Sequence, residues 1–173
     1  GTYEEMYKNL YAILAKAEGR TIIGTFSSQV ERVKWVIYAA AKLGKKVALD
    51  GYSMKMNVEI AKKLGYIKEP KGIMIDIKEA HRYPDNQVVV ICTGAQGEEN
   101  AVLMRVVNKI HRHIELKKSD TVIFSSSVIP GNERSIQRLK DNIYRQCDHV
   151  LHGDIMDVHI SGHSTRQDIV EMI

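Results

Sequence analysis

The sequence predicts an α/β fold in which helices cover both faces of a doubly wound, mainly parallel sheet. Short apolar segments typical of strands alternate along the chain with longer segments whose apolar residues recur at helical period. The strand segments show no alternation of polar and apolar residues, which indicates burial on both faces. The chain has 173 residues, 44% hydrophobic and 27% charged, without a linker, repeat or low-complexity tract. We therefore expect residues 1–173 to form one domain that needs neither a disulfide nor a structural metal.

Capping signals and glycine stops define the helices of the first half. Thr2 and Glu5 have capping-box spacing and predict a helix that stops at Gly19. Ser28 and Glu31 repeat this spacing ahead of a second helix, and β-rich runs predict the strands. In chain order, the predicted elements are a helix from 2 to about 17, a strand at 21–26, a helix from 28 to 43, a strand at 46–49, a helix at 53–64 and a short strand at 73–75 followed by a helical turn.

The second half repeats the order of strand and helix three times. Asn132 is placed to cap the second of these three helices, and the charge of Glu133 suits the positive end of a helix. In chain order, the predicted elements are a strand at 88–91, a helix from about 98 to 110, a strand at 121–124, a helix from about 132 to 145, a strand at 157–160 and a helix that begins near 165 and continues to the end.

Charge, cysteine use and hydropathy limit the class of protein. The chain has 25 Lys and Arg against 21 Asp and Glu, and the net charge of +4 is compatible with a nucleic acid or another polyanion as partner without requiring one. Cys92 and Cys147 lack metal-ligand spacing, which favours reduced, buried thiols in a cytoplasmic protein. The amino terminus has no leader features, and no run of about 18 apolar residues is available to cross a membrane.

Small and polar residues gather where the predicted strands end. Ligands bind at that edge of a parallel sheet, because the following helices direct their free N–H groups there. The candidate stretches are 50–53, 93–98, 125–127, 130–132 and 161–164. Turns and helix caps also require such residues, and this explains any single loop. Three consecutive hydroxyls at 125–127 exceed the needs of one cap, so together with helix-start amides they predict a phosphate site.

The sequence lacks the common nucleotide-binding motifs. Neither G-x-x-x-x-G-K-[ST] nor G-x-G-x-x-G occurs, which disfavours nucleotide hydrolysis and a Rossmann-type enzyme that uses NAD.

Seven histidines raise the question of a metal site or an acid catalyst. Four of them lie near the carboxy terminus without the spacing of a helical metal motif: His149, His152, His159 and His163. We therefore expect no metal in this chain, and His149 and His152 to flank an edge strand. His111 and His113 are expected to be solvated residues at a helix end. His163 follows a glycine at a strand end, where it is either a structural turn residue or a proton donor.

Five runs of the sequence together carry a resemblance to a known family. They are Ile22–Ser28, Gly51–Met54, Ile91–Glu98, Ser125–Glu133 and His159–His163. In order and spacing they resemble the β-CASP domain of ribonuclease J, and the resemblance spans nearly the whole chain. In this family the β-CASP domain is inserted into a zinc-binding metallo-β-lactamase domain.

The resemblance implies a function in RNA processing and decay. The family cleaves RNA by 5′-to-3′ exonuclease and endonuclease action, and two zinc ions are expected in the parent enzyme, which is also expected to form a homo-oligomer. His163 corresponds to the family's β-CASP histidine, which reaches the scissile phosphate. The positions that correspond to the pocket for the 5′-monophosphate of single-stranded RNA are Ser125, Ser127, Asn132, His159, Ser161 and Gly162.

The sequence also departs from the family pattern. The zinc motif H-x-H-x-D-H is absent, the acidic motif would precede Gly1, and the last motif histidine would follow Ile173. We therefore expect an excised domain without a metal or cofactor of its own, inactive without its partner domain. Tyr52 stands where the family often has Arg, which affects one expected contact in the cleft. The alternative is a stand-alone α/β module that binds a nucleotide or phosphate without catalysis.

Overall fold

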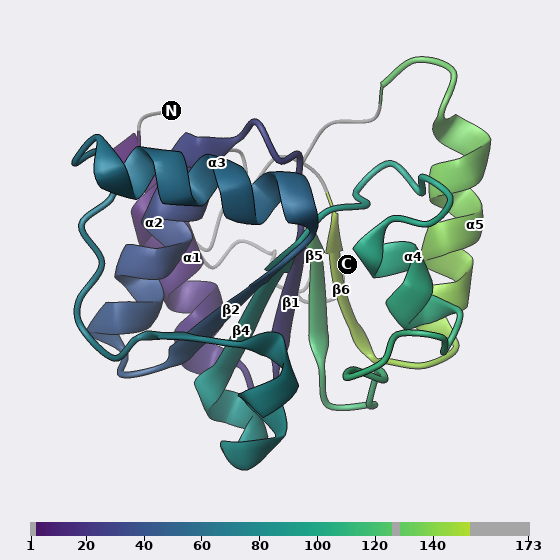
Figure 1. The fold of residues 1–173 in the computed structure, drawn as a ribbon. Helices are drawn as coiled ribbons and strands as arrows, with labels where there is room; N and C mark the ends of the chain where they lie inside the picture. Colours follow the sequence, from purple (N-terminus) through teal and green to yellow (C-terminus); the bar gives the residue numbers. More distant parts are fainter. Residues whose placement is uncertain (1–2, 126–128, 153–173) are drawn as a thin grey trace.

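The computed structural model describes residues 3–125 and 129–152 (Figure 1). In this part of the chain, six strands form one sheet in the order β3-β2-β4-β1-β5-β6, and every hydrogen-bonded strand pair is parallel. The predicted strand at 157–160 and helix from 165 lie outside the described residues. The elements are α1 (Tyr3–Lys16), β1 (Thr21–Gly24), α2 (Val30–Lys42), β2 (Lys46–Asp50), α3 (Tyr52–Lys63), β3 (Met74–Ile75), the 3-10 helices η1 (Ile77–Arg82) and η2 (Asp85–Gln87), β4 (Val88–Cys92), α4 (Val102–Val107), β5 (Thr121–Phe124), α5 (Glu133–Tyr144) and β6 (His149–His152).

Helices cover both faces of this sheet, which confirms the predicted fold class. In Figure 1, α1, α2 and α3 lie on one face, and α4 and α5 lie on the other. Successive strand residues pack alternately into the two cores: in β1, Ile23 joins the core under α1–α3, and Ile22 joins the core under α4 and α5. All the residues of β1, β4 and β5 are buried. Burial on both faces is the reason that these strands are apolar throughout.

The predicted capping box at the start of α2 does not form, so this prediction is wrong. The helix begins at Val30, and its cap residue Gln29 makes no side-chain capping bond. The carboxylate of Glu31, expected to pair with Ser28, instead accepts a hydrogen bond from Trp35 Nε1 at 2.7 Å. These two residues are four apart on the helix and therefore lie on the same face, where the indole competes successfully for the carboxylate.

α4 is much shorter than the helix predicted at 98–110. Turn residues occupy both ends of the expected range. Gly97 and Asn100 have φ angles of 76° and 68°, in the left-handed region that an α-helix excludes, and Lys109 has a φ angle of 64°. The helix that does form lies within the predicted range, and four buried side chains lie within Val102–Val107.

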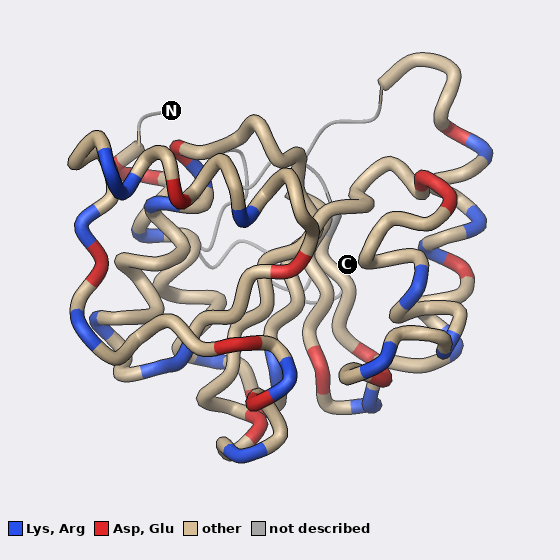
Figure 2. The backbone as a smooth tube through the Cα atoms, viewed as in Figure 1, with Lys and Arg blue, Asp and Glu red and all other residues tan. Residues whose placement is uncertain are grey.

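Charged side chains of both signs are spread over the helices and loops. In Figure 2, the Lys and Arg positions lie among Asp and Glu positions along the backbone of the helices and loops. No helix within 3–125 and 129–152 combines the length and the apolar character that a membrane span requires.

Both cysteines are buried and free of disulfides, as predicted. Cys92 is the last residue of β4, and burial raises the pKa of its thiol far above the ordinary value. Burial also raises the pKa of Cys147 to about 11. Thiols with such pKa values stay protonated at neutral pH and are poor nucleophiles, so neither cysteine is a candidate for catalysis.

A buried ion pair joins the starts of β1 and β5 at the amino edge of the sheet. Arg20 Nε lies 3.0 Å from Asp120 Oδ1, and Arg20 Nη2 lies 2.7 Å from Asp120 Oδ2. The same carboxylate accepts the main-chain N–H groups of Arg20 and Lys117. The guanidinium also donates to the carbonyl of Glu115. These bonds compensate the Asp120 carboxylate, which is fully buried, for the water that it loses on folding.

Removal of the buried carboxylate should therefore destabilise the fold strongly. We expect Asp120→Ala to lower the free energy of unfolding by about 3–5 kcal/mol, because Arg20 would remain buried without its partner. The matched control is Lys118→Ala, which removes an ion pair with Asp148 between two largely exposed side chains. It should cost less than about 1 kcal/mol. Urea unfolding followed by circular dichroism measures both, and equal losses would contradict the role given to Asp120.

Candidate functional site

The carboxyl ends of β1, β4 and β5 lie side by side at one edge of the sheet. β1 pairs with β4 on one side and with β5 on the other. The ladder continues beyond the strands, since the Thr25 N–H donates to the Cys92 carbonyl at 2.9 Å and the Ser125 N–H donates to the Gly24 carbonyl at 3.1 Å. The chain then leaves β1 and β4 toward helices on opposite faces. Ligands of open α/β sheets bind at such a crevice.

Gln96 connects two of the loops at this edge. It lies between β4 and α4, is 3% exposed, and directs its side chain to the segment that precedes α5. Its Oε1 accepts the Ile129 N–H at 3.0 Å and the Asn132 Nδ2 at 3.1 Å. Its main-chain carbonyl accepts the Ser135 hydroxyl at 3.0 Å. Asn132 precedes α5 as predicted, but its side chain bonds to Gln96 and makes no capping bond.

Ser125 is built into the sheet edge. It is 1% exposed, and its hydroxyl lies 3.3 Å from the Gly24 carbonyl, to which it donates. The Arg32 guanidinium of α2 donates to the Ser125 carbonyl. Ser125 therefore anchors the start of its loop. A small, mostly apolar cavity beneath it is lined by Met6, Ile23, Thr25, Arg32, Val33, Val36, Ile91 and Ser125.

Five predicted site residues fall outside the described residues and stay predictions. They are Ser127, His159, Ser161, Gly162 and His163. Tyr52 is the first residue of α3 and is 78% exposed at the carboxyl edge.

A histidine and an aspartate form a hydrogen-bonded pair on the α4 side of the sheet. His111 Nε2 lies 2.6 Å from Asp50 Oδ2. His111 Nδ1 accepts the main-chain N–H groups of His113 and Ile114, which leaves the ring proton on Nε2, where it is donated to Asp50. The His111 side chain is 5% exposed, so the predicted solvated position is wrong for this residue, whereas His113 is exposed as expected.

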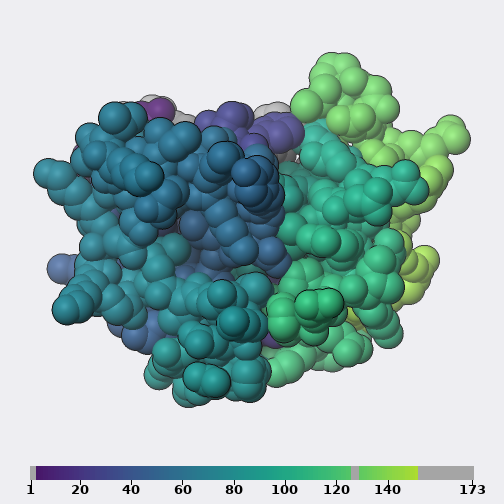
Figure 3. Space-filling view, viewed as in Figure 1, coloured from purple at the N-terminus to yellow at the C-terminus, as the bar shows by residue number. Residues whose placement is uncertain are grey.

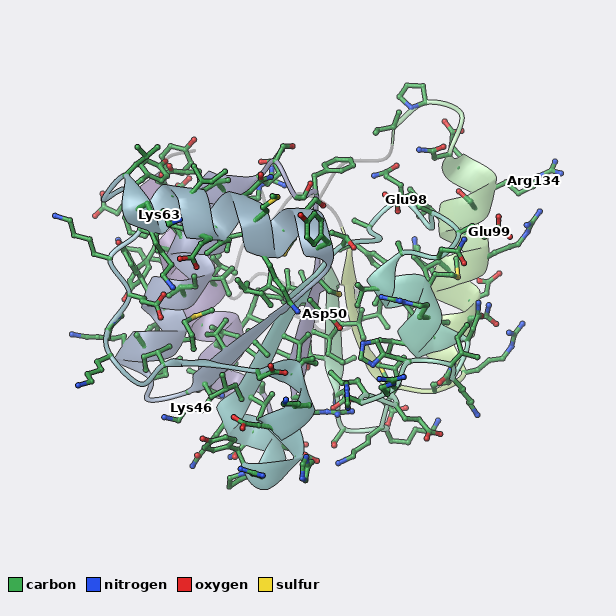
Figure 4. All side chains as sticks on the ribbon, in the orientation of Figure 1. Lys46, Asp50, Lys63, Glu98, Glu99 and Arg134 are labelled. Atoms are coloured by element: carbon green, nitrogen blue, oxygen red, sulfur yellow. The ribbon has the colours of Figure 1, made fainter. Side chains whose placement is uncertain are left out.

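The Asp50–His111 pair lies where two parts of the chain meet. In Figure 3, the segment that contains α3 adjoins the segment around α4. Figure 4 shows the Asp50 side chain directed between these helices. A Cβ added to Gly51 would lie 3.0 Å from the Thr93 side chain, so the β2–α3 and β4–α4 loops are in close contact.

Carboxylates flank the segment that Gln96 holds. Figure 4 places Glu98 and Glu99 on the loop before α4, facing the first turn of α5, while Arg134 extends outward. Glu98 Oε1 accepts the Gln96 N–H at 3.0 Å, and Glu133 Oε1 accepts the Gly131 N–H at 2.9 Å. Both carboxylates thus accept main-chain N–H groups of the loops at this edge.

The described residues do not fit a zinc centre. Within 3–125 and 129–152, no three His, Cys, Asp or Glu side chains are placed so that they could hold one metal ion. Asp50 and His111 are bonded to each other. His149 and His152 begin and end β6, the last strand in the described sheet order, and thus flank an edge strand as predicted.

Three residues of this edge were missed by sequence reasoning. Gln96 lies within a run that the sequence singled out, yet its partner Asn132 is 36 residues away, and no local spacing indicates that contact. In the sequence, Arg32 occupies an ordinary polar position of an amphipathic helix, and nothing there indicates its contact with Ser125. His111 follows a predicted helix end, and its contact with Asp50 spans 61 residues.

Comparison of the sequence with known proteins identifies a family. The model of the family described as "Ribonuclease J, beta-CASP domain" matches residues 18–143. The chain belongs to this family. The match contains the described candidates Ser125 and Asn132 and also Gln96, so the hydrogen bonds around Gln96 lie within the family's own sequence range.

Relatives named ribonuclease J are similar to this β-CASP chain over almost all of its length. Ribonuclease J of Helicobacter pylori strain J99 is 38% identical over 156 residues, which cover 90% of this chain and 22% of that protein. Ribonuclease J 1 of Streptococcus pyogenes is 39% identical over 161 residues, 93% of this chain and 29% of that protein. Ribonuclease J of Thermus thermophilus is 39% identical over 165 residues, 95% of this chain and 29% of that protein. The chain thus spans less than a third of the length of these curated relatives.

The Asp50–His111 bond should contribute measurably to the stability of this β-CASP chain. We expect His111→Ala to lower the free energy of unfolding by about 2 kcal/mol, because a largely buried carboxylate loses its donor. His113→Ala, at an exposed position two residues away, should change it by less than about 0.5 kcal/mol. Urea titrations of the two variants test this, and indistinguishable midpoints would show that the bond contributes nothing.

Proposed function

We propose that this chain is the RNA-binding β-CASP domain of a ribonuclease J-type enzyme that acts in RNA processing and decay. The observation that carries this proposal is the family match over residues 18–143, together with relatives named ribonuclease J that align with at least 90% of the chain. The enzyme as a whole would hydrolyse RNA by 5′-to-3′ exonuclease and endonuclease action. This chain would contribute the pocket for the RNA 5′-monophosphate and one catalytic histidine.

The carboxyl edge of the sheet supports the phosphate pocket of this proposal. Asn132 lies at the start of α5, a helix of 12 residues whose amino end favours an anion. In the proposal, Asn132 binds the terminal phosphate together with Ser127, His159, Ser161 and Gly162, and Ser125 fixes the start of the loop. Such contacts position a nucleic acid without reading its bases, so we propose weak sequence preference.

His163 is proposed as the catalytic residue of this chain. A histidine beside the scissile phosphate donates a hydrogen bond or a proton to the leaving 3′-oxygen, and its ordinary pKa suits this near neutral pH. In this proposal the two zinc ions belong to the metallo-β-lactamase domain of the parent enzyme, because the zinc motif H-x-H-x-D-H does not occur in these 173 residues. We therefore propose that the chain by itself is inactive.

Discrimination between RNA ends tests the proposed phosphate pocket. Fluorescence anisotropy with 3′-labelled decamers, in EDTA to prevent cleavage, should show at least about tenfold tighter binding of 5′-monophosphorylated RNA than of 5′-hydroxyl RNA. A phosphate held by several hydrogen bonds to charged oxygens supports a difference of this size. Equal affinities for the two RNAs would contradict the proposed phosphate pocket. Equal affinity for a mononucleotide and for the phosphorylated decamer would favour the stand-alone module.

A substitution in the full-length enzyme tests the catalytic histidine. His163→Ala should lower kcat by about a hundredfold or more while KM for 5′-phosphorylated RNA changes little, because a general acid acts in the transition state. The control is His149→Ala, at the start of β6, which should leave kcat within about twofold. Near-normal turnover of the His163 variant refutes the role, and RNA hydrolysis by the purified 173-residue chain with added zinc refutes the proposed division of labour.

A further inference from the structure

One buried side chain, Gln96, holds the segment that leads into α5. The two hydrogen bonds accepted by its Oε1 reach both ends of the segment 129–132. This segment follows β5, whereas Gln96 follows β4, so the bonds join loops that leave strands on either side of β1. At 3% exposure, Gln96 is itself inaccessible to a large ligand.

We propose that Gln96 is a positioning residue that orients Asn132 and the main chain of 129–132 for the 5′-phosphate of RNA. The inference rests on the proposed function, because it presumes that Asn132 contacts this phosphate. An amide nitrogen has two N–H groups, and the bond to Gln96 at 3.1 Å uses one of them. The second N–H then points in a direction set by Gln96, and this is the group that faces the phosphate.

The position of Gln96 is itself tightly fixed. Its carbonyl accepts the Ser135 hydroxyl at 3.0 Å, and its N–H donates to Glu98 Oε1 at 3.0 Å. A Cβ added to the next residue, Gly97, would lie 2.8 Å from the Ser135 carbonyl oxygen. The main chain of this loop thus lies directly against the main chain of the first turn of α5. Because the main chain of Gln96 is fixed, its side-chain oxygen has a defined position relative to its two donors, as preorganised binding sites require.

The uncharged side chain of Gln96 avoids repulsion of a bound phosphate. A carboxylate would accept the same two hydrogen bonds, but it would add a negative charge next to a doubly charged phosphate, where carboxylates from Glu98 and Glu133 are already present. A glutamine oxygen holds the segment without that repulsion. Two substitutions by side chains of similar size can therefore distinguish the effect of the hydrogen bonds from the effect of the neutral charge.

The experiment compares Gln96→Met and Gln96→Glu in the binding assay with 5′-phosphorylated and 5′-hydroxyl decamers. Methionine fills the space but accepts no comparable hydrogen bond, so the preference for the phosphorylated end should fall about tenfold while affinity for the 5′-hydroxyl RNA stays within about twofold. Glutamate keeps the acceptor oxygen but places a negative charge at a buried position, so it should lower the thermal midpoint and should also lose the preference by charge repulsion.

Gln146→Met is the matched control. Gln146 also uses its side-chain amide to join α4 and α5, by donating to the Val107 carbonyl at 2.8 Å, but it lies beyond the opposite end of α5. Its substitution should lower stability without changing the preference between RNA ends. A full preference in Gln96→Met or Gln96→Glu overturns the inference, as does an equal loss in Gln146→Met. If the unsubstituted chain itself shows no preference, the proposed function fails first and the inference fails with it.

Discussion

The parallel direction of all hydrogen-bonded strand pairs is the constraint on which the rest of this structure depends. Because the strands point the same way, their carboxyl ends meet at one edge, with neighbouring strands about 4.8 Å apart. Loops that begin at Thr25, Thr93 and Ser125 therefore start beside one another although they are far apart in sequence. Gly24 contributes by its lack of a side chain, since a Cβ there would lie 2.9 Å from Leu103, and α4 can pack directly onto the end of β1.

The two edges of the sheet are stabilised by different chemistry. At the amino edge, the Arg20 guanidinium and the Asp120 carboxylate form a buried, bidentate ion pair with no place for a ligand between them. At the carboxyl edge, Gln96, Asn132 and Ser135 bond to one another through neutral amide and hydroxyl groups, although charged contacts of Glu98 and of Asp50 with His111 lie nearby. Charges buried at the first edge must stay paired, because an unpaired buried charge is costly. Neutral polar groups at the carboxyl edge lose much less free energy than buried charges do when a hydrogen-bond partner is exchanged.

Much of the fold could be predicted from the sequence, because a parallel sheet requires continuous apolar strands separated by amphipathic helices. The strand at 88–91 and the helix at 132–145 have this character and are observed as β4 and α5. Local signals failed where tertiary or neighbouring contacts compete with them. Trp35 donates a hydrogen bond to the Glu31 carboxylate that a capping box required. The left-handed conformations of Gly97 and Asn100 are incompatible with an α-helix, so α4 starts later than predicted.

The candidate site was less predictable than the fold. The resemblance singled out Asn132 and the loop that starts at Ser125 as candidates, because these residues lie in motifs whose order matches the family. It did not identify Gln96 as a hydrogen-bond acceptor or His111 as the partner of Asp50, because both contacts join residues that only the folded chain brings together. Spacing along a sequence indicates strands and helix faces, but it carries no information about which two loops meet in the folded chain.

The bonds that Gln96 makes through its oxygens have a consequence for how this edge responds to acidity. The donors are a main-chain amide, the Asn132 carboxamide and the Ser135 hydroxyl, none of which gains or loses a proton near neutral pH. These three bonds are thus insensitive to changes between mildly acidic and mildly basic solution. A terminal phosphate, by contrast, takes its second negative charge at about pH 6. Any response of this edge to acidity would accordingly originate in the ligand or in nearby imidazoles and carboxylates, while the bonds to the Gln96 oxygens stay unchanged.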